Sequence, residues 1–550
     1  MDNDIRKLTV SHDKIACRSQ QNLVNARTTT EGWDSQKIRE NMATAFRKAS
    51  GGKCAYDWQL DVAEALQLGL DCTVVAGTGS GKTIPYALPL LLPENNKKII
   101  IVISPLKALQ RDQARRFCKL GIRAAAINEN TFTPAIKKEI EAFKYQALFL
   151  SPEMCLKTNL ARDMITSLGA SQHIIACIID EAHCISEWGG DFRKTYQDLS
   201  QLRAMLTQFR KVPFGAFSAT LTPSALKSVL DTLLIEIDSA YYINRGNDRP
   251  NIKMEVQEIN GAEDFNAIDS ILNLDKITTP DDIPKTLIFV NERMQTLGLW
   301  RYIRSKLRAC DPSFVTLCDY LHGLRGELTK EIVMDRFFRG ETKILVATEA
   351  VGMGADIPDV ELVIQFCAPK SLAVWVQRTG RAGRLPTIQA TAIMLVEKSA
   401  FQTQKAPAER SKKTATSAQA KQGPRRKPPD ILYKKQVDPS LRNWLESPTC
   451  RRDGIDEFFH NPPQASVLES SSTVPTPTYS RLEWHETSFS SMAVLPDDVI
   501  KTLSWDATLC SVEDIRRRFD EDTWLFVSRH AQDVLDVLAS TDREWEERTK

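Results

Sequence analysis

Residues 74–83 read VVAGTGSGKT, an apolar run that leads into a glycine-rich turn and then into a helical start. Glycines let the backbone curl so that successive N–H groups and the N-terminus of the following helix face one phosphate. Lys82 would reach the β- and γ-phosphates, and the Thr83 hydroxyl would hold Mg²⁺. Ala76 occupies the position of the first glycine in the strict G-x-x-x-x-G-K-T pattern. We expect nucleotide contacts from Gly77, Thr78, Gly79, Ser80, Gly81, Lys82 and Thr83.

Short apolar, β-branched runs recur on both sides of this loop, with gaps long enough for crossover helices. They lie at 72–76, 98–104, 147–151, 174–180 and 214–219. Such runs are typical of parallel strands covered on both faces. The pattern stops near 241–252, and a second series follows at 286–290, 343–347, 360–366 and 391–396. The sequence therefore predicts an α/β fold with two tandem, doubly wound parallel-sheet lobes that can close on a ligand.

The composition excludes several classes of protein. The 550 residues are 42% hydrophobic and 26% charged, as in ordinary globular proteins, and the formal net charge is only +2. Attraction to a polyanion must therefore come from local patches. No run approaches the roughly 18 apolar residues of a spanning helix, so we expect no membrane partner. The 12 cysteines form no C-x-x-C pair, which favours free thiols in a reducing compartment. The start, MDNDIRKLTV, lacks the apolar core of a secretory signal.

The amino-acid composition of the chain changes after residue 402. Residues 403–430 are rich in Lys, Arg, Ala, Ser and Pro, as in a disordered linker. The basic PRRKPP at 424–429 is a nuclear-import signal, a nucleic-acid patch or simply a solvated linker. Apolar periodicity in 431–460 and 495–540 predicts a mostly helical or partly disordered extension. We divide the chain into an N-terminal extension (1–50), an ATP-binding lobe (51–240), a second lobe (241–402), the linker (403–430) and a divergent region (431–550).

The run at 174–180 ends in the sequence Asp180-Glu181-Ala182-His183. Carboxylates at the carboxyl end of a parallel strand lie beside the phosphate loop in a sheet of this kind. Asp180 is the natural second ligand of Mg²⁺, and Glu181 can orient and deprotonate an attacking water. Acids at strand ends are common, but together with the phosphate loop they predict ATP hydrolysis with Mg²⁺ as cofactor.

With these motifs the chain resembles the superfamily 2 helicases, and more narrowly the RecQ-like DNA helicases. Residues 180–196, DEAHCISEWGGDFRKTY, are similar to a run that forms an aromatic-rich loop in that family. The loop senses single-stranded DNA and couples it to hydrolysis, although Gly190 stands where the family usually has His. Trp188 and Phe192 offer π-faces to bases and Arg193 offers a cation. The alternative is that both aromatic side chains pack beneath a helix.

Three other stretches of the first lobe resemble family motifs. Residues 103–113 resemble a motif that touches the nucleic-acid backbone, with Lys107 and Gln110 as candidates. Residues 217–223 resemble the motif that links hydrolysis to unwinding, with Ser218 and Thr220 able to hydrogen-bond the region 180–183. Gln59 sits where the family reads adenine, and its amide could pair with the N6 and N7 edge. Asp57 replaces the expected Arg, so adenine selectivity stays open.

The second lobe carries matching signatures at RPNI (249–252) and HGL (322–324). In the segment 347–364, Asp356 resembles the residue that contacts the ribose. Residues 377–384 read QRTGRAGR, and Gln377, Arg381 and Arg384 are candidate catalytic residues. The i, i+3 spacing of the two arginines predicts a helical stretch that aims both toward the facing lobe, where they would stabilise charge on the γ-phosphate. Arg378 and Leu385-Pro386 depart from RecQ usage, and QRTGRAGR is nearer to the RNA-helicase branch.

The resemblance implies RecA-like lobes and a 3′–5′ DNA helicase whose partners are ATP and single-stranded and duplex DNA, with nuclear residence. Cys450 matches the first ligand of the family's zinc module, but one thiol cannot build a tetrahedral site, so we predict no zinc. Three alternatives stay open: an RNA helicase, a nucleic-acid-stimulated ATPase that remodels complexes without unwinding, and a non-catalytic scaffold.

Replacing Trp188 tests the role of the aromatic-rich loop. We expect Trp188→Ala to spare basal ATP hydrolysis and to weaken its stimulation by single strands, because a stacking platform is lost. The measurement is the ATPase rate with and without an oligonucleotide. Unchanged stimulation would mean that Trp188 only packs.

Overall fold

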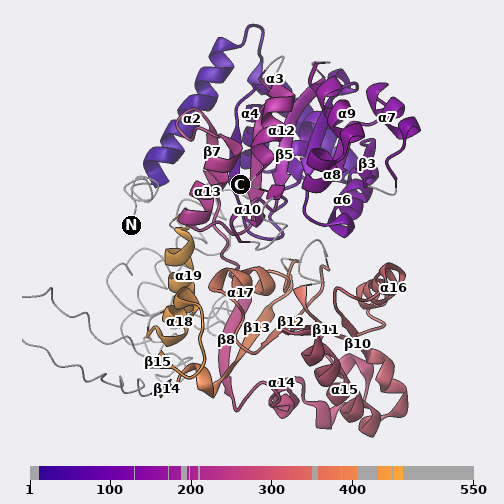
Figure 1. Cartoon of the computed structure of the whole chain (residues 1–550), viewed down its shortest axis with the longest axis vertical. Helices are drawn as coiled ribbons and strands as arrows, with labels where there is room; N and C mark the ends of the chain where they lie inside the picture. Colours follow the sequence, from indigo (N-terminus) through magenta and orange to yellow (C-terminus); the bar gives the residue numbers. More distant parts are fainter. Residues whose placement is uncertain are drawn as a thin grey trace, which may run out of the picture. The chain divides into compact units, whose positions relative to one another are not determined.

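The computed structural model describes residues 12–128, 131–170, 173–187, 195–196, 198–207, 211–349, 357–385, 387–404, 432–448 and 450–462. The chain divides into two units. One comprises Met1–Glu446 with Ile455–Leu468, and the other comprises Ser447–Gly454 with Glu469–Lys550. Both large sheets belong to the first unit (Figure 1).

The first sheet has seven parallel strands in the order β3-β4-β2-β5-β6-β1-β7. Its strands are β1 (Cys72–Val75), β2 (Ile99–Ile103), β3 (Ala124–Ile127), β4 (Ala147–Leu150), β5 (Ile174–Asp180), β6 (Phe214–Ser218) and β7 (Tyr241–Asn244). Every residue of β1, β2, β4, β5 and β6 is buried. The continuous apolar runs arise because helices cover both faces of these strands.

Alternate residues of the central strands supply two separate apolar cores. Ile100 and Val102 of β2 pack with α4, α5 and α6, while Ile101 and Ile103 pack with α7, α8, α9, α12 and α13. These helices are α4 (Asp57–Gln67), α5 (Ile84–Ala87), α6 (Lys107–Lys119), α7 (Pro134–Glu141), α8 (Pro152–Lys157), α9 (Asn159–Ala170), α12 (Leu199–Thr207) and α13 (Pro223–Leu233). A short helix, α10 (Cys184–Glu187), follows the DEAH sequence. The doubly wound first lobe is as the sequence predicted.

The second sheet has six parallel strands in the order β10-β11-β9-β12-β13-β8 (Figure 1). They are β8 (Ile252–Ile259), β9 (Thr286–Phe289), β10 (Cys318–Leu321), β11 (Ile344–Ala347), β12 (Leu362–Phe366) and β13 (Ala390–Glu397). The helices are α14 (Asp269–Leu272), α15 (Arg293–Cys310), α16 (Glu327–Phe338) and α17 (Leu372–Thr379). This sheet also has an apolar core on each face. The two predicted parallel-sheet lobes are confirmed.

The N-terminal helices α2 (His12–Thr29) and α3 (Ser35–Ala49) join the first lobe through a buried carboxylate, Glu64 of α4. Its oxygens accept hydrogen bonds from Arg27 Nη2 at 2.6 Å, Trp33 Nε1 at 2.9 Å and Arg39 Nη1 at 3.4 Å. Burial would raise the pKa of Glu64, but hydrogen bonds from Arg27, Ser35 and Trp33 and the charge of Arg27 hold it below its usual value. Residues 12–49 are therefore built into the lobe rather than appended to it.

The chain returns to the second lobe after the basic linker; residues 405–430 of the linker, and residue 431 after it, lie outside the described part. Strands β14 (Thr403–Gln404) and β15 (Leu432–Tyr433) form an antiparallel pair. Leu441 and Trp444 of α18 (Pro439–Glu446) and Ile455 and Phe459 of α19 (Arg451–Phe459) are buried in the core that contains Trp375. Residues 432–446 and 455–462 thus complete the second lobe, which extends past the predicted boundary at 402.

Removing the Glu64 carboxylate tests the attachment of α2 and α3. We expect Glu64→Ala to lower the free energy of unfolding of the first lobe by about 3 kcal/mol, because three donors lose their acceptor. The urea midpoint of the whole chain would report this. Glu31→Ala, on an exposed residue of the same hairpin, is the matched control. Equal midpoints for the two variants would contradict the assignment.

Candidate active site

The phosphate loop lies between β1 and α5. Thr83 is the N-cap residue of α5, Pro85 lies in its first turn, and the α-helix gives way at Leu88 to a 3₁₀ turn that contains Pro89. Gly79 and Gly81 have φ values of +86° and +79°, a region that favours glycine. A Cβ at Gly81 would lie 2.7 Å from Gln59 Nε2. The tight, side-chain-free turn is thus a requirement of the packing.

Lys82 folds back across this loop. Its Nζ donates hydrogen bonds to the carbonyl oxygens of Ala76 at 2.9 Å and Gly77 at 3.3 Å. Burial lowers the pKa of Lys82, Glu181 and Asp180 oppose this, and two arginines lower it further. These are Arg384 and Arg381 of the second lobe. A cation held on carbonyl oxygens beside other cations is ready to transfer its hydrogen bonds to phosphate oxygens.

The carboxylates Asp180 and Glu181 lie at the carboxyl end of β5. Gln113 Nε2 donates to Asp180 Oδ2 at 2.5 Å, and burial together with the charge of Glu181 raises the pKa of Asp180 to about 6. Burial would also raise the pKa of Glu181, but four basic groups hold it below its usual value. They are His183, Lys82, Arg381 and Arg384. Glu181 is therefore kept as a carboxylate, the form that accepts a proton.

His183 joins the ends of three elements by hydrogen bonds. Its Nδ1 lies 3.0 Å from Ser218 Oγ, at the end of β6. The Ser218 hydroxyl donates to the Thr220 carbonyl oxygen at 3.1 Å and accepts from the Thr220 N–H at 3.2 Å. Because the hydroxyl proton is used there, Nδ1 of His183 is the donor to Ser218, and Nε2 is left to accept from Gln377 Nε2 of α17 at 3.4 Å. Ser218 and Gln377 thus meet at one histidine, and Thr220 holds the Ser218 hydroxyl.

The arginines Arg381 and Arg384 lie in a turn, so the predicted helical stretch is wrong. Helix α17 ends at Thr379 with Gly380 as its C-cap, and Gly383 has a φ of +51°. Glycine at the end of a helix favours this termination. Both arginines nevertheless lie close enough to Lys82 and Glu181 to shift their pKa values. We call residues 380–384 the arginine turn.

Arg378, the departure from RecQ usage, is buried inside the second lobe. Its Nε donates to Glu349 Oε1 at 2.9 Å and its Nη1 to Asn291 Oδ1 at 3.3 Å. Its guanidinium carbon lies 5.1 Å from the centre of the Phe289 ring. These contacts give Arg378 a packing role behind the arginine turn.

Gln59 and Gln110 have other partners than those the sequence suggested. Gln59 is buried; its Nε2 donates to the Ser80 and Gly81 carbonyl oxygens at 3.2 and 3.3 Å, and its Oε1 accepts from the Tyr56 N–H. These hydrogen bonds stabilise the phosphate loop. Adenine recognition by Gln59 stays a prediction. Gln110 is fully buried and donates to the Ser104 carbonyl oxygen at 2.8 Å, so it has a partner inside the lobe, and its contact with nucleic acid stays a prediction.

Lys107 is exposed at the first position of α6, after β2. Trp188, Phe192, Arg193 and Asp356 lie outside the described residues. Gln113 is the site residue that sequence reasoning missed. It could have been predicted, because it follows Gln110 by one helical turn on the buried face of α6.

The residues near the phosphate loop fit Mg²⁺. Thr83 and Asp180 would hold it through a hydroxyl and a carboxylate, which are hard oxygen ligands. Oε2 of Glu181 lies 3.4 Å from His183 Nδ1, and burial together with the neighbouring charge of Glu181 raises the pKa of Asp180, so a cation at Asp180 would offset the repulsion between the two carboxylates. Among the described residues no group of three or more His, Cys, Asp or Glu is placed to hold a metal alone, and Mg²⁺ bound with ATP needs only one or two protein carboxylates. The absence of zinc stays a prediction.

Comparisons with known proteins agree with this arrangement. Residues 56–229 match the DEAD/DEAH box helicase family, and residues 266–386 match the helicase conserved C-terminal domain. A probable ATP-dependent DNA helicase RecS of Bacillus subtilis is 31% identical over 59% of this chain and 61% of its own length. The ATP-dependent DNA helicase RecQ of Pasteurella multocida is 28% identical over 73% of this chain and 57% of its own. The motor core is similar to that of the RecQ-like superfamily 2 helicases.

The RecQ-like chain spans about three fifths of the length of these two relatives. Among solved structures, the DUF1998 helicase MrfA bound to DNA matches with a TM-score of 0.55 at 18% identity, over 66% of this chain and 51% of that one. That likeness concerns the fold, two tandem RecA-like lobes. No helix in the described residues is long and apolar enough to cross a membrane.

Lys82→Ala tests the phosphate loop of the RecQ-like core. We expect ATP turnover to fall by about 100-fold or more, because the charge that meets the β- and γ-phosphates is lost, with little change in thermal unfolding. Steady-state ATPase measurements check this against Lys97→Ala, an exposed lysine on the loop that precedes β2. Retained turnover would place the phosphate site elsewhere.

Proposed function

We propose that this RecQ-like chain is an ATP-dependent 3′–5′ DNA helicase that couples hydrolysis to movement along one strand and to duplex unwinding. One observation carries the proposal. Gln377 of α17, in the second lobe, lies 3.4 Å from His183 of the first lobe, and Arg381 and Arg384, which follow α17, act on the charges of Lys82 and Glu181. Hydrolytic groups divided between two lobes make turnover depend on how the lobes meet.

The residues divide the work of hydrolysis among them. The phosphate loop and Lys82 bind the triphosphate, and Glu181 takes a proton from the attacking water. Arg381 and Arg384 stabilise the charge that develops on the γ-phosphate. Mg²⁺, when bound, neutralises phosphate charge. Through Gln377, Ser218 and Thr220, His183 connects the end of the hydrolytic strand to the next strand and to α17. This is a route by which hydrolysis can change the contact between the lobes.

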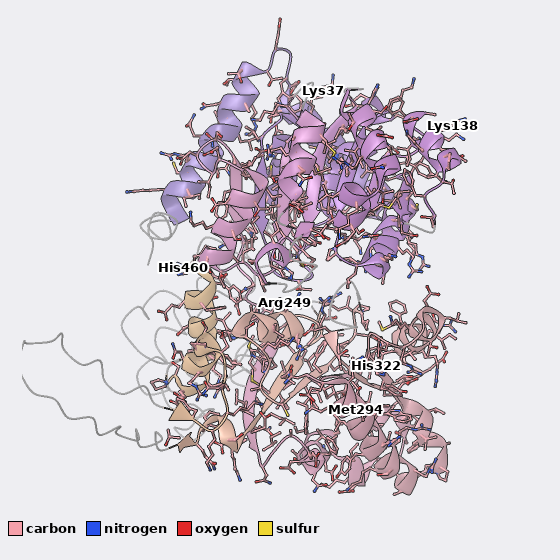
Figure 2. All side chains as sticks on the ribbon, in the orientation of Figure 1. Lys37, Lys138, Arg249, Met294, His322 and His460 are labelled. Atoms are coloured by element: carbon pink, nitrogen blue, oxygen red, sulfur yellow. The ribbon has the colours of Figure 1, made fainter. Side chains whose placement is uncertain are left out.

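Basic groups gather at the same end of both sheets. Lys107 follows β2, Arg293 opens α15 after β9, and His322 follows β10. Burial and the charges of Arg325, Arg293 and Lys330 lower the pKa of His322, so three cations lie near this residue of the second lobe, one of them, Arg325, paired with Asp319 at 3.1 Å (His322 is labelled in Figure 2). Cations at the carboxyl edges of both sheets suit a strand lying across the two lobes, with most contacts to phosphates.

The choice of DNA and of 3′–5′ polarity rests on the RecQ-like relatives. An RNA helicase is the second candidate, favoured by the sequence QRTGRAGR at 377–384. A nucleic-acid-stimulated ATPase that remodels complexes without unwinding uses the same hydrolytic groups, so the described site suits it as well.

A strand-displacement panel separates these functions. Matched DNA and RNA duplexes, each with a 3′ or a 5′ overhang, are tested with and without ATP. We expect displacement only of the 3′-overhang DNA, only with ATP, and with binding that weakens steeply as salt rises. RNA-only displacement would reverse the substrate. Stimulated ATPase without displacement on any substrate would favour the remodelling ATPase.

A further inference from the structure

The segment that connects the two sheets, residues 245–251, runs along the phosphate loop. It leaves β7 at Asn244 and enters β8 at Ile252. Arg245 N–H donates to the Val75 carbonyl oxygen at 2.7 Å, and Gly77 N–H donates to the Gly246 carbonyl oxygen at 2.9 Å. A Cβ at Gly77 would lie 3.3 Å from Asn247 Cα. The connector is therefore packed against the loop that binds the triphosphate.

From this connector the Arg249 side chain reaches both halves of the hydrolytic site (Arg249 is labelled in Figure 2). Nη1 donates to the carbonyl oxygen of Thr78, in the phosphate loop, at 2.8 Å. Nη2 donates to the carbonyl oxygens of Ala382, at 3.4 Å, and Gly383, in the arginine turn. One guanidinium group thus hydrogen-bonds the two loops that must approach each other for hydrolysis.

Asn251 fixes the second-lobe side of this contact. Its Nδ2 donates to the Gly383 carbonyl oxygen at 2.7 Å and to the Ile388 carbonyl oxygen at 2.9 Å, and its Oδ1 lies 3.4 Å from Arg249 Nε. A Cβ at Gly383 would lie 2.7 Å from Asn251 Nδ2. Arg249, Asn251 and Gly383 therefore form one packed unit of the second lobe, and the bond to Thr78 is the part that joins the first lobe.

The chemistry of this contact requires arginine. A planar guanidinium carries five donors in a fixed fork and can address carbonyl oxygens on two sides, whereas an ammonium on a flexible stem cannot hold the same geometry. The group is also held beside a like charge: burial and the charge of Arg384 lower the pKa of Arg249. Because repulsion would separate the two arginines, the hydrogen bonds to backbone oxygens keep them together.

We propose that Arg249 is a positioning residue, which ties the phosphate loop to the arginine turn and thereby sets the approach of Arg381 and Arg384 to the triphosphate. This inference rests on the ATPase activity proposed above and adds to it a residue from the connector. Arg249 acts through the two loops rather than on the reacting atoms. Its loss should therefore affect the rate of hydrolysis more than the binding of nucleotide.

The variants Arg249→Gln, Arg249→Lys and Asn251→Ala, made in the full chain, test the proposal. We expect kcat for ATP in the presence of single-stranded DNA to fall about 10- to 100-fold in both Arg249 variants, with KM changing less than about threefold. Asn251→Ala should show a smaller fall in kcat, because only the second-lobe contact is loosened. Arg301→Gln, an exposed arginine of α15, is the matched control. Circular dichroism and thermal unfolding verify that each variant folds.

A double-mutant cycle with Arg381→Gln separates positioning from an independent effect. If Arg249 acts through the arginine turn, Arg249→Gln should add less than about threefold to the loss caused by Arg381→Gln alone. If the losses of kcat in the two single variants multiply in the double variant, the proposal is wrong. A wild-type kcat in Arg249→Lys would also overturn it.

Lobe closure on AMP-PNP gives a readout that does not depend on turnover. It can be followed by energy transfer between one dye on each lobe. We expect closure in the wild type and its reduction in Arg249→Gln. If the wild type closes on AMP-PNP but has no ATPase activity, the ATPase assignment is wrong. If Arg249→Gln then fails to close, the role of Arg249 is still supported. Equal closure in both would overturn that role.

Discussion

The balance of buried charge around Lys82 is the constraint on which the rest of the site depends. Three cations, Lys82, Arg381 and Arg384, and two carboxylates, Asp180 and Glu181, act on one another in a site shielded from water. Burial of charge is costly unless each charge has a partner. The excess of cations is matched by a bound triphosphate, so nucleotide stabilises the arrangement in which both lobes contribute. This electrostatic requirement explains why hydrolysis would depend on the contact between lobes.

The parallel sheet makes that concentration of charge possible. In the first sheet β5, β6 and β1 are neighbours, so their carboxyl ends lie side by side although their motifs are far apart in the sequence. Asp180 ends β5, Ser218 ends β6, and the phosphate loop follows β1. Each strand is buried along its whole length, which fixes its register and therefore the position of the polar residue at its end. The same geometry on the second sheet positions α17 and the arginine turn after β12.

The sequence predicted the fully buried strands correctly. It was less successful where contacts between separate parts of the chain determine the local structure. The run 174–180 coincides with β5 because a strand covered on both faces has a continuous apolar signal. β8 is buried only at its two ends, Ile252 and Ile259, and β3 is a short alanine-rich strand, so neither gave that signal. The helical prediction for Arg381 and Arg384 used spacing alone, whereas Gly380 and Gly383 end the helix. Glu64 pairs with side chains 25 to 37 residues earlier in the chain, and short motifs carry no information about such pairs.

The connector between the lobes is held on two sides, and this links the second half of the chain to the hydrolytic site. On one side Arg249 and the backbone of residues 245–246 contact the phosphate loop. On the other side, Asn461 Nδ2 donates to Asn247 Oδ1 at 2.8 Å, and Asn244 Nδ2 donates to the His460 carbonyl oxygen at 3.3 Å. Because residues 455–459 are anchored in the second-lobe core, these hydrogen bonds join the connector to that core from the side opposite the phosphate loop.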